Sequence, residues 1–301
     1  MIETDEIERS LVSDAVCCKE PNLISCNSLK DEESLKDKLQ RKSLTKLTVE
    51  GKELPFSNEI PPNGFVYKNK EGDEAILSIN QDNTGVFGTL KFIDGRSLAI
   101  EHCGDGHVLK EYDVSSFKED TLIADTDYVV DDDEVSNDFF VDNTTLVTYS
   151  VMFYYTPEFA SVTTDIVGYI DQVLDETNQG YEQSGVPVRV TRFCVEAATI
   201  NDIQDTSDFL SAFRNMKADV TALKNTADAA ALLALDFNSC GVAYLNTVTG
   251  SGRTISIATK SCALGYFSFG HELGHNFGAH HDPDQVNHNI YQHLSIVYPG
   301  K

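Results

Sequence analysis

The sequence predicts an α/β fold in which a small β-rich unit precedes a second half built on a mainly parallel, twisted sheet. The first observation is the order of patterns from Leu146 onward, where strand-like and helix-like segments alternate. Such alternation is typical of a parallel sheet covered by helices. The second observation is a series of short alternating runs between Leu47 and Phe117, punctuated by glycine, proline and asparagine. This pattern is typical of a small antiparallel β domain.

The elements of the second half can be placed one by one. Apolar positions recur at 3.6-residue spacing from Val162 to Tyr181, which predicts a long amphipathic helix that ends at Gly185. The other predicted elements are strands at 146–155, 186–190, 229–237, 241–245 and 254–258, and a helix that begins near Ser207.

The charge of the chain excludes two classes of partner. Its 301 residues hold 23 Lys and Arg against 48 Asp and Glu, a net charge of −25. So acidic a chain lacks the clustered cations that neutralise phosphates, which argues against binding to nucleic acid or to an anionic membrane surface. The longest purely apolar run, residues 229–235, is far shorter than the roughly 20 residues of a membrane-spanning helix.

The same charge is spread unevenly and suggests where the domains divide. No Lys or Arg occurs from Glu119 to Val188, and residues 125–142 read DTDYVVDDDEVSNDFFVD. Like charges at this density repel one another and resist packing, which favours a solvated linker. We therefore expect four segments: a charged N-terminal segment with little structure, a β-rich domain, an acidic linker and a second domain, at residues 1–45, 46–118, 119–145 and 146–301.

The motif that carries chemistry lies at residues 271–282, which read HELGHNFGAHHD. His271 and His275 are four residues apart, so on a helix both imidazoles project from one face and can bind a single ion. Glu272 can reach a water on that ion without being a ligand itself. The pair of histidines predicts a metal site on this helix.

The residues after the helix complete the pattern. Gly278 can take the positive φ that reverses a chain, and the chain can then return His281 as a third nitrogen ligand. Short His-Glu-x-x-His motifs also occur by chance in unrelated helices, but the added glycine and histidine make that interpretation much weaker. No Glu follows Glu272 that could take the place of His281. Three neutral nitrogens with an open fourth position are typical of a catalytic zinc site.

This motif resembles the zinc signature of the metzincin metallopeptidases. Asp282, directly after His281, resembles the adamalysin or reprolysin branch, which includes snake-venom metalloproteinases and the ADAM proteases. The resemblance extends over roughly residues 146–282. It implies a metzincin-type catalytic domain whose edge strand, near residues 254–258, flanks the substrate cleft.

The resemblance also implies a function. It implies a zinc-dependent endopeptidase that acts on protein or peptide substrates, with one zinc ion on His271, His275 and His281. Glu272 is then the general base, which takes a proton from the attacking water and passes it to the leaving amine. Gly278 and Asp282 are expected to shape and steady the chain around the third histidine.

The same resemblance implies a regulatory role for the first half of the chain. It implies that the β-rich domain is an inhibitory propeptide and that the enzyme is made as a zymogen. Cys103 lies in this domain, and its thiolate could occupy the fourth zinc position and hold the enzyme latent. An ordinary, partly buried cysteine is the alternative.

The cysteines also bear on localisation. Seven cysteines fit an oxidising compartment better than the cytosol, and we favour a disulfide between Cys240 and Cys262. The first residues, MIETDEIERSL, lack the apolar core of a secretory leader. We expect a secreted, extracellular protein whose N-terminus continues upstream of this sequence.

One departure from the metzincins opens an alternative. Metzincins carry a methionine turn downstream of the third histidine, whereas the methionines here are Met1, Met152 and Met216. We therefore expect the catalytic domain to be incomplete at its C-terminus. The alternative function is a non-catalytic zinc-binding or decoy remnant of such a protease, although Glu272 favours the enzyme. A venom or salivary toxin would be a use of the same activity.

Overall fold

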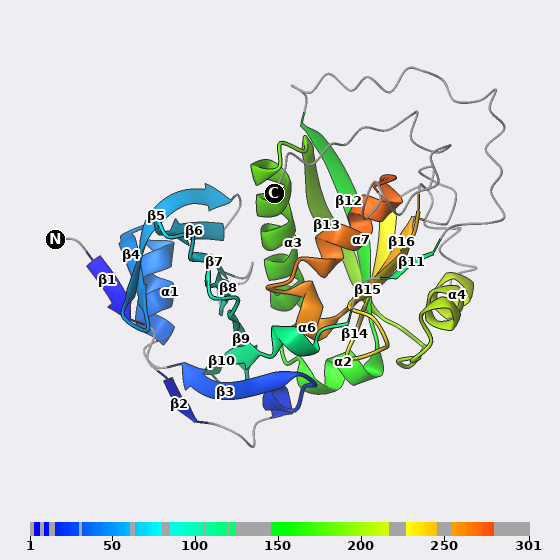
Figure 1. Ribbon diagram of the computed structural model, residues 1–301, viewed down its shortest axis with the longest axis horizontal. Coiled ribbons are helices and arrows are strands. Elements are labelled where there is room, and N and C mark those ends of the chain that lie inside the picture. Colours follow the sequence, from blue (N-terminus) through cyan, green and yellow to red (C-terminus); the bar gives the residue numbers. More distant parts are fainter. Residues whose placement is uncertain are drawn as a thin grey trace.

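The computed structural model places two β-sheets side by side, one from each half of the chain (Figure 1). The structure describes residues 3–6, 9–11, 16–29, 32–60, 64–79, 85–104, 106–118, 121–123, 146–216, 227–245 and 254–279. The predicted mixed α/β class is confirmed. Within the described residues, no helix combines the length and the apolar character that a membrane crossing requires.

The first half forms a ten-stranded sheet in the spatial order β1-β4-β5-β6-β7-β8-β9-β10-β3-β2. The strands are β1 (Glu3–Glu6), β2 (Arg9–Leu11), β3 (Leu23–Leu29), β4 (Leu44–Val49), β5 (Lys52–Ile60), β6 (Gly64–Lys68), β7 (Glu74–Ile79), β8 (Val86–Lys91), β9 (Ser97–Cys103) and β10 (Gly106–Tyr112). Neighbouring strands run antiparallel except β1 and β4. A tight turn connects β8 to β9 at Gly95, whose φ of +90° suits glycine.

The expectation that residues 1–45 carry little structure is wrong. Strand β3 pairs with β10, and helix α1 (Glu32–Gln40) covers the sheet. Leu35 and Leu39, four residues apart on α1, are buried in the core of the first sheet, and one such apolar stripe is enough to dock a short helix.

The second half forms a six-stranded sheet in the order β11-β15-β16-β14-β12-β13. Its strands are β11 (Thr121–Ile123), β12 (Val147–Tyr155), β13 (Val188–Ala197), β14 (Ala229–Ala234), β15 (Gly241–Tyr244) and β16 (Ile255–Thr259). Neighbours are parallel except β15 and β16, which are antiparallel. The helices are α2 (Pro157–Val162), α3 (Ile166–Gln183), α4 (Thr206–Met216), α6 (Lys260–Ala263) and α7 (Ser268–Asn276).

Two expectations about this sheet need correction. The strand predicted at residues 254–258 is not at the edge, because β16 lies between β14 and β15 and all five of its residues are buried. The predicted linker at residues 119–145 begins with a strand, since β11 pairs with β15. The rest of that range, residues 124–145, lies outside the described residues.

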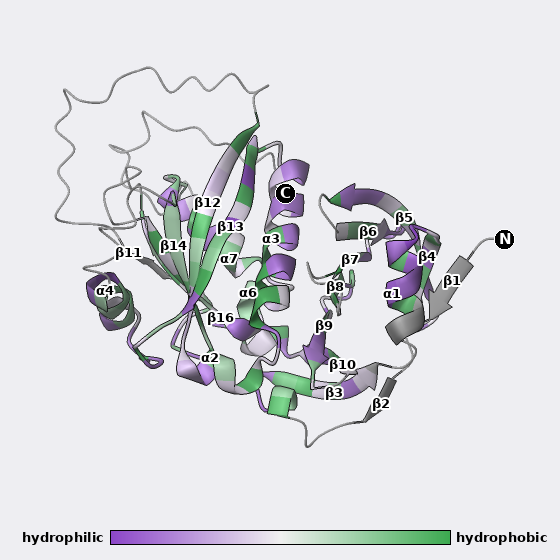
Figure 2. Cartoon of the chain, turned by 180° about the vertical axis from the view of Figure 1, so that it is seen from behind, coloured by the Kyte–Doolittle hydropathy of each residue, from purple (hydrophilic) through white to green (hydrophobic). Residues whose placement is uncertain are grey.

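Alternating side chains on the strands divide the second half into three layers. On β12, Phe153 packs with Val173 of α3 and Phe269 of α7, whereas its neighbour Tyr154 packs with Phe213 of α4. Helices α3 and α7 therefore cover one face of the sheet and α4 covers the other (Figure 1). Coloured by hydropathy, β14 is largely hydrophobic, whereas α1, α3 and α4 carry hydrophilic stretches (Figure 2).

Helix α3 also carries the contact between the two halves, because its outer side packs on β7 and β8. Gln172 Nε2 donates a hydrogen bond to the carbonyl oxygen of Ile76, 3.2 Å away. Phe87 of β8 approaches α3 so closely that a Cβ at Gly168 would lie 2.5 Å from its Cζ. The absence of a side chain at this position lets strand and helix touch.

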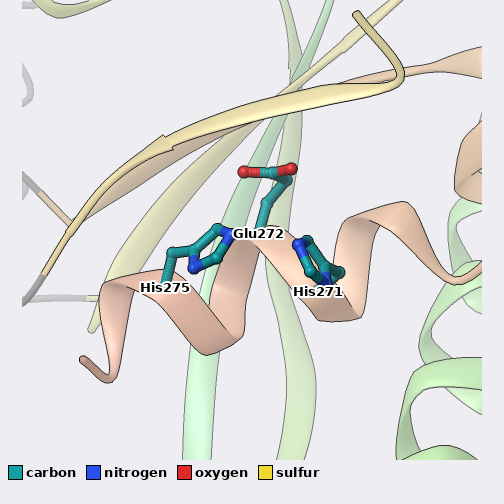
Figure 3. A group of neighbouring side chains, drawn as sticks. All are labelled: His271, Glu272 and His275. Atoms are coloured by element: carbon teal, nitrogen blue, oxygen red, sulfur yellow. The ribbon is translucent and has the colours of Figure 1, made fainter. Parts of the chain in front are cut away.

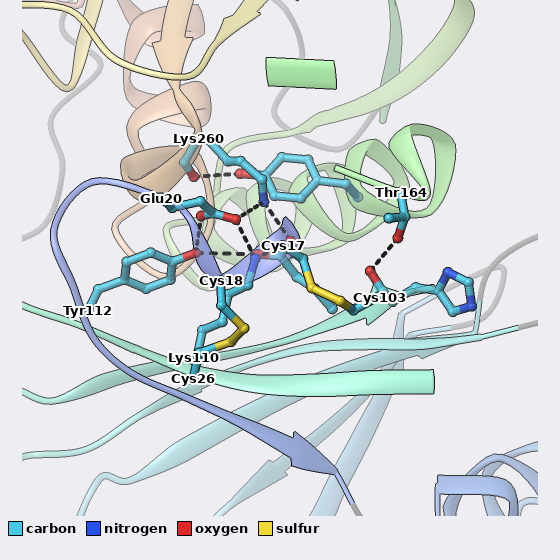
Figure 4. A network of polar contacts seen from close by, with 12 residues as sticks. Cys17, Cys18, Glu20, Cys26, Cys103, Lys110, Tyr112, Thr164 and Lys260 are labelled. Atoms are coloured by element: carbon cyan, nitrogen blue, oxygen red, sulfur yellow. Dashed lines mark hydrogen bonds and ion pairs between the residues drawn. A yellow bond between two sulfur atoms is a disulfide. The ribbon is translucent and has the colours of Figure 1, made fainter. Parts of the chain in front are cut away.

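A buried network of charged side chains spans the same interface (Figure 4). Lys110 and Lys260, one from each half, both contact Glu20 and Glu101, and all four side chains are at most 3% exposed. Burial alone would raise the pKa of Glu101, but the two lysines outweigh it and lower that pKa to about 2. Removal of one partner from such a network leaves an uncompensated buried charge, so the network fixes how the halves meet.

The segment that leads from β16 into α7, residues 260–267, is held by the first half along its length. Lys260 enters the charged network, and the ring of Tyr266 lies 5.2 Å from that of Phe117. The ammonium of Lys91 lies 3.0 Å from the ring centroid of Phe267. The start of α7 is therefore fixed from the side of the first half.

Asp175 on α3 makes the interface sensitive to pH. Its carboxylate is buried and accepts a hydrogen bond from the hydroxyl of Ser78 on β7. Burial raises the pKa of Asp175 to about 7; Ser78 and Arg189 oppose the rise, and Asp171 adds to it. Below pH 4 both the folded and the unfolded chain hold this proton. As the pH rises to 7, the unfolded chain releases the proton while much of the folded chain keeps it. The free energy of unfolding therefore falls by about 3–4 kcal/mol.

We predict that Asp175→Asn stabilises the protein more at pH 8 than at pH 5, because the amide keeps the hydrogen-bond acceptor and never ionises. Thermal unfolding followed by circular dichroism should show a rise in Tm that is several degrees larger at pH 8. Ser78→Ala is the control, since it keeps the carboxyl group and its pH dependence. An equal change in Tm at both pH values would contradict the account.

Candidate metal centre

Helix α7 carries the motif found in the sequence, and its end is defined by backbone hydrogen bonds. The N–H of Gly278 donates to the carbonyl oxygen of His275 at 2.8 Å, and the N–H of Ala279 donates to that of Gly274 at 3.0 Å. This pair of bonds is the Schellman motif, which requires a positive φ at its first donor residue. Gly278 has a φ of +92°, so it ends the helix as the sequence predicts.

The inner side of α7 is anchored to both neighbouring layers. Asn276 Nδ2 donates to the carbonyl oxygens of Tyr244 and Ile255, at 2.8 and 3.3 Å, and so ties the helix to β15 and β16. The hydroxyl of Tyr181 on α3 donates to the carbonyl oxygen of Gly270 at 2.7 Å. These bonds leave α7 little freedom to slide or rotate on the sheet.

His271 and His275 project from successive turns of α7 (Figure 3). Their ring centroids are 4.5 Å apart, and the rings are nearly perpendicular, at 85°. Candidate ligand atoms of His271, Glu272 and His275 all lie within 4.8 Å of one another. His271 is exposed, whereas His275 is buried, so the group forms a shallow site that is open on one side.

The backbone selects the tautomer of His275. Its Nδ1 lies 2.6 Å from the carbonyl oxygen of Ala279. A carbonyl oxygen only accepts hydrogen bonds, so Nδ1 carries a proton, and in the neutral ring Nε2 is the nitrogen with the lone pair. A histidine held in this way is typical of metal sites, where the second ring nitrogen is bonded to a carbonyl or carboxylate.

Glu272 is fully buried and lies on the side of the group away from solvent. Its side chain points from α7 toward β15, the strand that crosses above it in Figure 3. The backbone of Gly241 forms the wall on that side, because a Cβ there would lie 2.6 Å from Cγ and 2.7 Å from Cδ of Glu272. The carboxylate is thus confined next to the two imidazoles.

The chemistry of these donors fits zinc. Imidazole nitrogen is a preferred zinc ligand, and a neutral histidine that carries its proton on Nδ1 can bind the ion through Nε2. Two ligands on one helix also leave coordination positions for further groups. His281 and Asp282, the other residues that the sequence assigns to this site, lie outside the described residues.

The cysteines pair in three disulfides among the described residues. Cys240 is bonded to Cys262, which ties the start of β15 to α6 next to the site. Cys103 is bonded to Cys17, and Cys18 is bonded to Cys26. A sulfur in a disulfide has no thiolate to offer a metal, so the structure corrects the expectation that Cys103 is a latency switch.

Several residues that shape the site could not be identified from the sequence patterns. Asn276, Tyr181 and the carbonyl of Ala279 act through long-range or backbone contacts that no local pattern reveals. Gly241 did leave a signal, because a glycine within a strand often marks a close approach. The segment around it was interpreted only as a strand.

Part of the chain matches a known protein family. Residues 167–282 match the family described as metallo-peptidase family M12B, reprolysin-like. The matched segment begins in α3, contains α7 and ends at Asp282. The resemblance to the reprolysin branch is therefore confirmed over this segment.

Two relatives are named peptidyl-Asp metalloendopeptidase, from Stenotrophomonas maltophilia strains R551-3 and K279a, and each is 29% identical to this chain. The first alignment covers 69% of this chain and 52% of the relative, and the second covers 63% and 48%. The chain thus spans about half the length of these relatives.

A solved structure, that of metalloproteinase-II from Bacteroides fragilis, is similar over 84% of this chain and 86% of that one. The TM-score is 0.49 and the sequence identity is 17%, a likeness that identifies neither a function nor a residue.

We predict that Gly278→Ala lowers the free energy of unfolding by about 1–2 kcal/mol, because a Cβ disfavours the left-handed backbone at this position. Gly278→Asn should lose less, since asparagine tolerates that conformation. Chemical denaturation of the two variants measures the difference. If the alanine variant were as stable as the wild type, Gly278 would not be what ends α7.

Proposed function

We propose that this chain, whose residues 167–282 belong to the reprolysin-like metallopeptidases, is a zinc-dependent endopeptidase that hydrolyses peptide bonds in proteins. The observation that supports the proposal most is the convergence of His271, Glu272 and His275 on α7, within 4.8 Å of one another. The bond between Nδ1 of His275 and the carbonyl oxygen of Ala279 adds to it, since it makes Nε2 the nitrogen that could bind a metal. The names of the two relatives, both metalloendopeptidases, support the same activity.

His271 and His275 would hold the zinc ion, with His281 as the third ligand. The ion would supply Lewis-acid polarisation to a water molecule and to the scissile carbonyl. Gly278 is proposed to direct the chain toward the third ligand, and Asp282 to steady the turn that follows. These roles use the donor types that zinc prefers.

Glu272 would move the protons of the reaction. Its carboxylate accepts a proton from the attacking water and returns it to the leaving nitrogen as the peptide bond breaks. A positioned general base of this kind contributes about 10²–10⁴ in rate. Because Glu272 is fully buried, its orientation is set by the surrounding protein and not by solvent.

The proposal extends to the first half of the chain, which we take to be a propeptide-like domain over residues 46–118 of a secreted zymogen. Residues 16–29 belong with it, because they join its sheet and pair its cysteines. Three disulfides favour an oxidising compartment. The contacts on residues 260–267 give this domain a direct path to the start of α7.

A non-catalytic zinc-binding or decoy protein is the alternative function. Such a protein needs the histidines but has no physical need for a carboxylate confined beside them. Glu272 is buried against backbone that leaves room for it and for little else. This confinement favours the enzyme.

We predict that Glu272→Gln lowers kcat by about 10²–10⁴-fold on a fluorogenic peptide library while zinc content stays at one ion per chain. The amide fills the same space but accepts no proton from water. The library should include peptides with Asp, because the two relatives are named for peptidyl-Asp bonds.

His275→Ala is the matched variant, and it should lose both zinc and activity because it removes a ligand instead of the base. Zinc is measured by elemental analysis of the dialysed protein. Full activity in Glu272→Gln would show that another group is the base. Zinc binding without activity in the wild type, including after proteolytic removal of the first half, would favour the decoy.

A further inference from the structure

The strand β15 approaches the buried carboxylate of Glu272 more closely than any side chain would allow. A Cβ added at Gly241 would lie 2.6 Å from Cγ and 2.7 Å from Cδ of Glu272. Contacts under 3.0 Å between such atoms are essentially never seen, so a side chain at this position and the present conformation of Glu272 exclude each other.

The backbone at Gly241 does not itself require glycine. Its φ is not among the positive values of the described residues, and it pairs with Ala258 in the regular antiparallel ladder between β15 and β16. Glycine weakens a strand, so its use in a regular ladder calls for a spatial reason. The carboxylate of Glu272 is the group that occupies the space.

The strand cannot easily retreat from a side chain at this position. The hydroxyl of Ser239 donates to the carbonyl oxygen of Gly241 at 2.6 Å. The N–H of Thr259 donates to the carbonyl oxygen of Cys240 at 2.9 Å, and Cys240 is bonded to Cys262. The atoms on the other side belong to a flexible side chain, so Glu272 would move and the strand would stay.

We propose that Gly241 is a positioning residue for Glu272: the bare strand backbone confines the carboxylate beside the zinc-binding histidines and so sets the rate of proton transfer. This inference rests on the proposed function of Glu272. The glycine touches neither substrate nor metal, and it acts only through the side chain that it accommodates.

The test is Gly241→Ala, assayed for kcat, KM and zinc content. We expect the variant to fold, because the three atoms nearest to the new methyl group all belong to the side chain of Glu272 and none to the backbone. We expect kcat to fall by about 10²-fold, as expected when a catalytic group is misplaced by about 1 Å. KM and the one bound zinc ion should stay unchanged, since neither depends on the position of Glu272.

Val242→Ala is the matched control on the same strand. Adjacent strand residues point to opposite faces, and Val242 packs in the cluster that contains Phe209 and Phe213. Its truncation should lower the Tm and leave kcat within about twofold of the wild type. If both variants lost kcat equally, the effect would come from the strand and the proposal would be wrong.

A double variant separates this proposal from the proposed function. If Gly241 acts through Glu272, then Gly241→Ala adds no further loss of kcat to Glu272→Gln. A further loss of about 10²-fold in the double variant would overturn the inference. Full activity of Glu272→Gln alone would instead overturn the role of Glu272, whatever Gly241→Ala does. Wild-type kcat in Gly241→Ala, with Glu272→Gln inactive, would refute only the positioning role.

Discussion

The close contact between α7 and the start of β15 is the constraint on which the site depends. It brings a carboxylate, Glu272, against bare strand backbone, within 4.8 Å of candidate ligand atoms of the two histidines on the same helix. Asn276 holds the helix to the carbonyls of two strands, and the disulfide at Cys240 holds the strand. A buried ionisable group is costly unless its surroundings are arranged for it, so this contact is a built feature of the fold.

The same helix connects the site to the rest of the molecule. Its first turn follows residues 260–267, which the first half holds through Lys260, Tyr266 and Phe267. Buried charge pairs add little net stability, but they reject alternative arrangements because a mismatched charge would be left unpaired. The charged network at Lys260 therefore specifies where α7 begins, and the Schellman motif at Gly278 specifies where it ends.

The features that the sequence predicted correctly are those that depend only on neighbouring residues. The periodic apolar positions and Gly185 located the end of α3, and Gly278 located the end of α7, because helix ends follow from backbone conformation. The order of strands is set by contacts between distant segments, so the interior place of β16 could not be read from its own sequence. The pairing of Cys103 with Cys17, 86 residues away, is of the same kind. In the site, the spacing of the histidines was readable, whereas the tautomer of His275 and the role of Gly241 required the fold.

The most direct test of the account is the X-ray absorption spectrum at the zinc edge of protein loaded with one equivalent of zinc. The account predicts nitrogen and oxygen ligands at about 2.0–2.1 Å, with an imidazole signal that is lost together with the bound zinc in His275→Ala. It predicts no sulfur ligand, since six of the seven cysteines are in disulfides and Cys194 packs with Phe209 and Phe213 on the face of the sheet opposite α7. Sulfur at about 2.3 Å, or a spectrum that His275→Ala leaves unchanged, would contradict the assignment of the metal to α7.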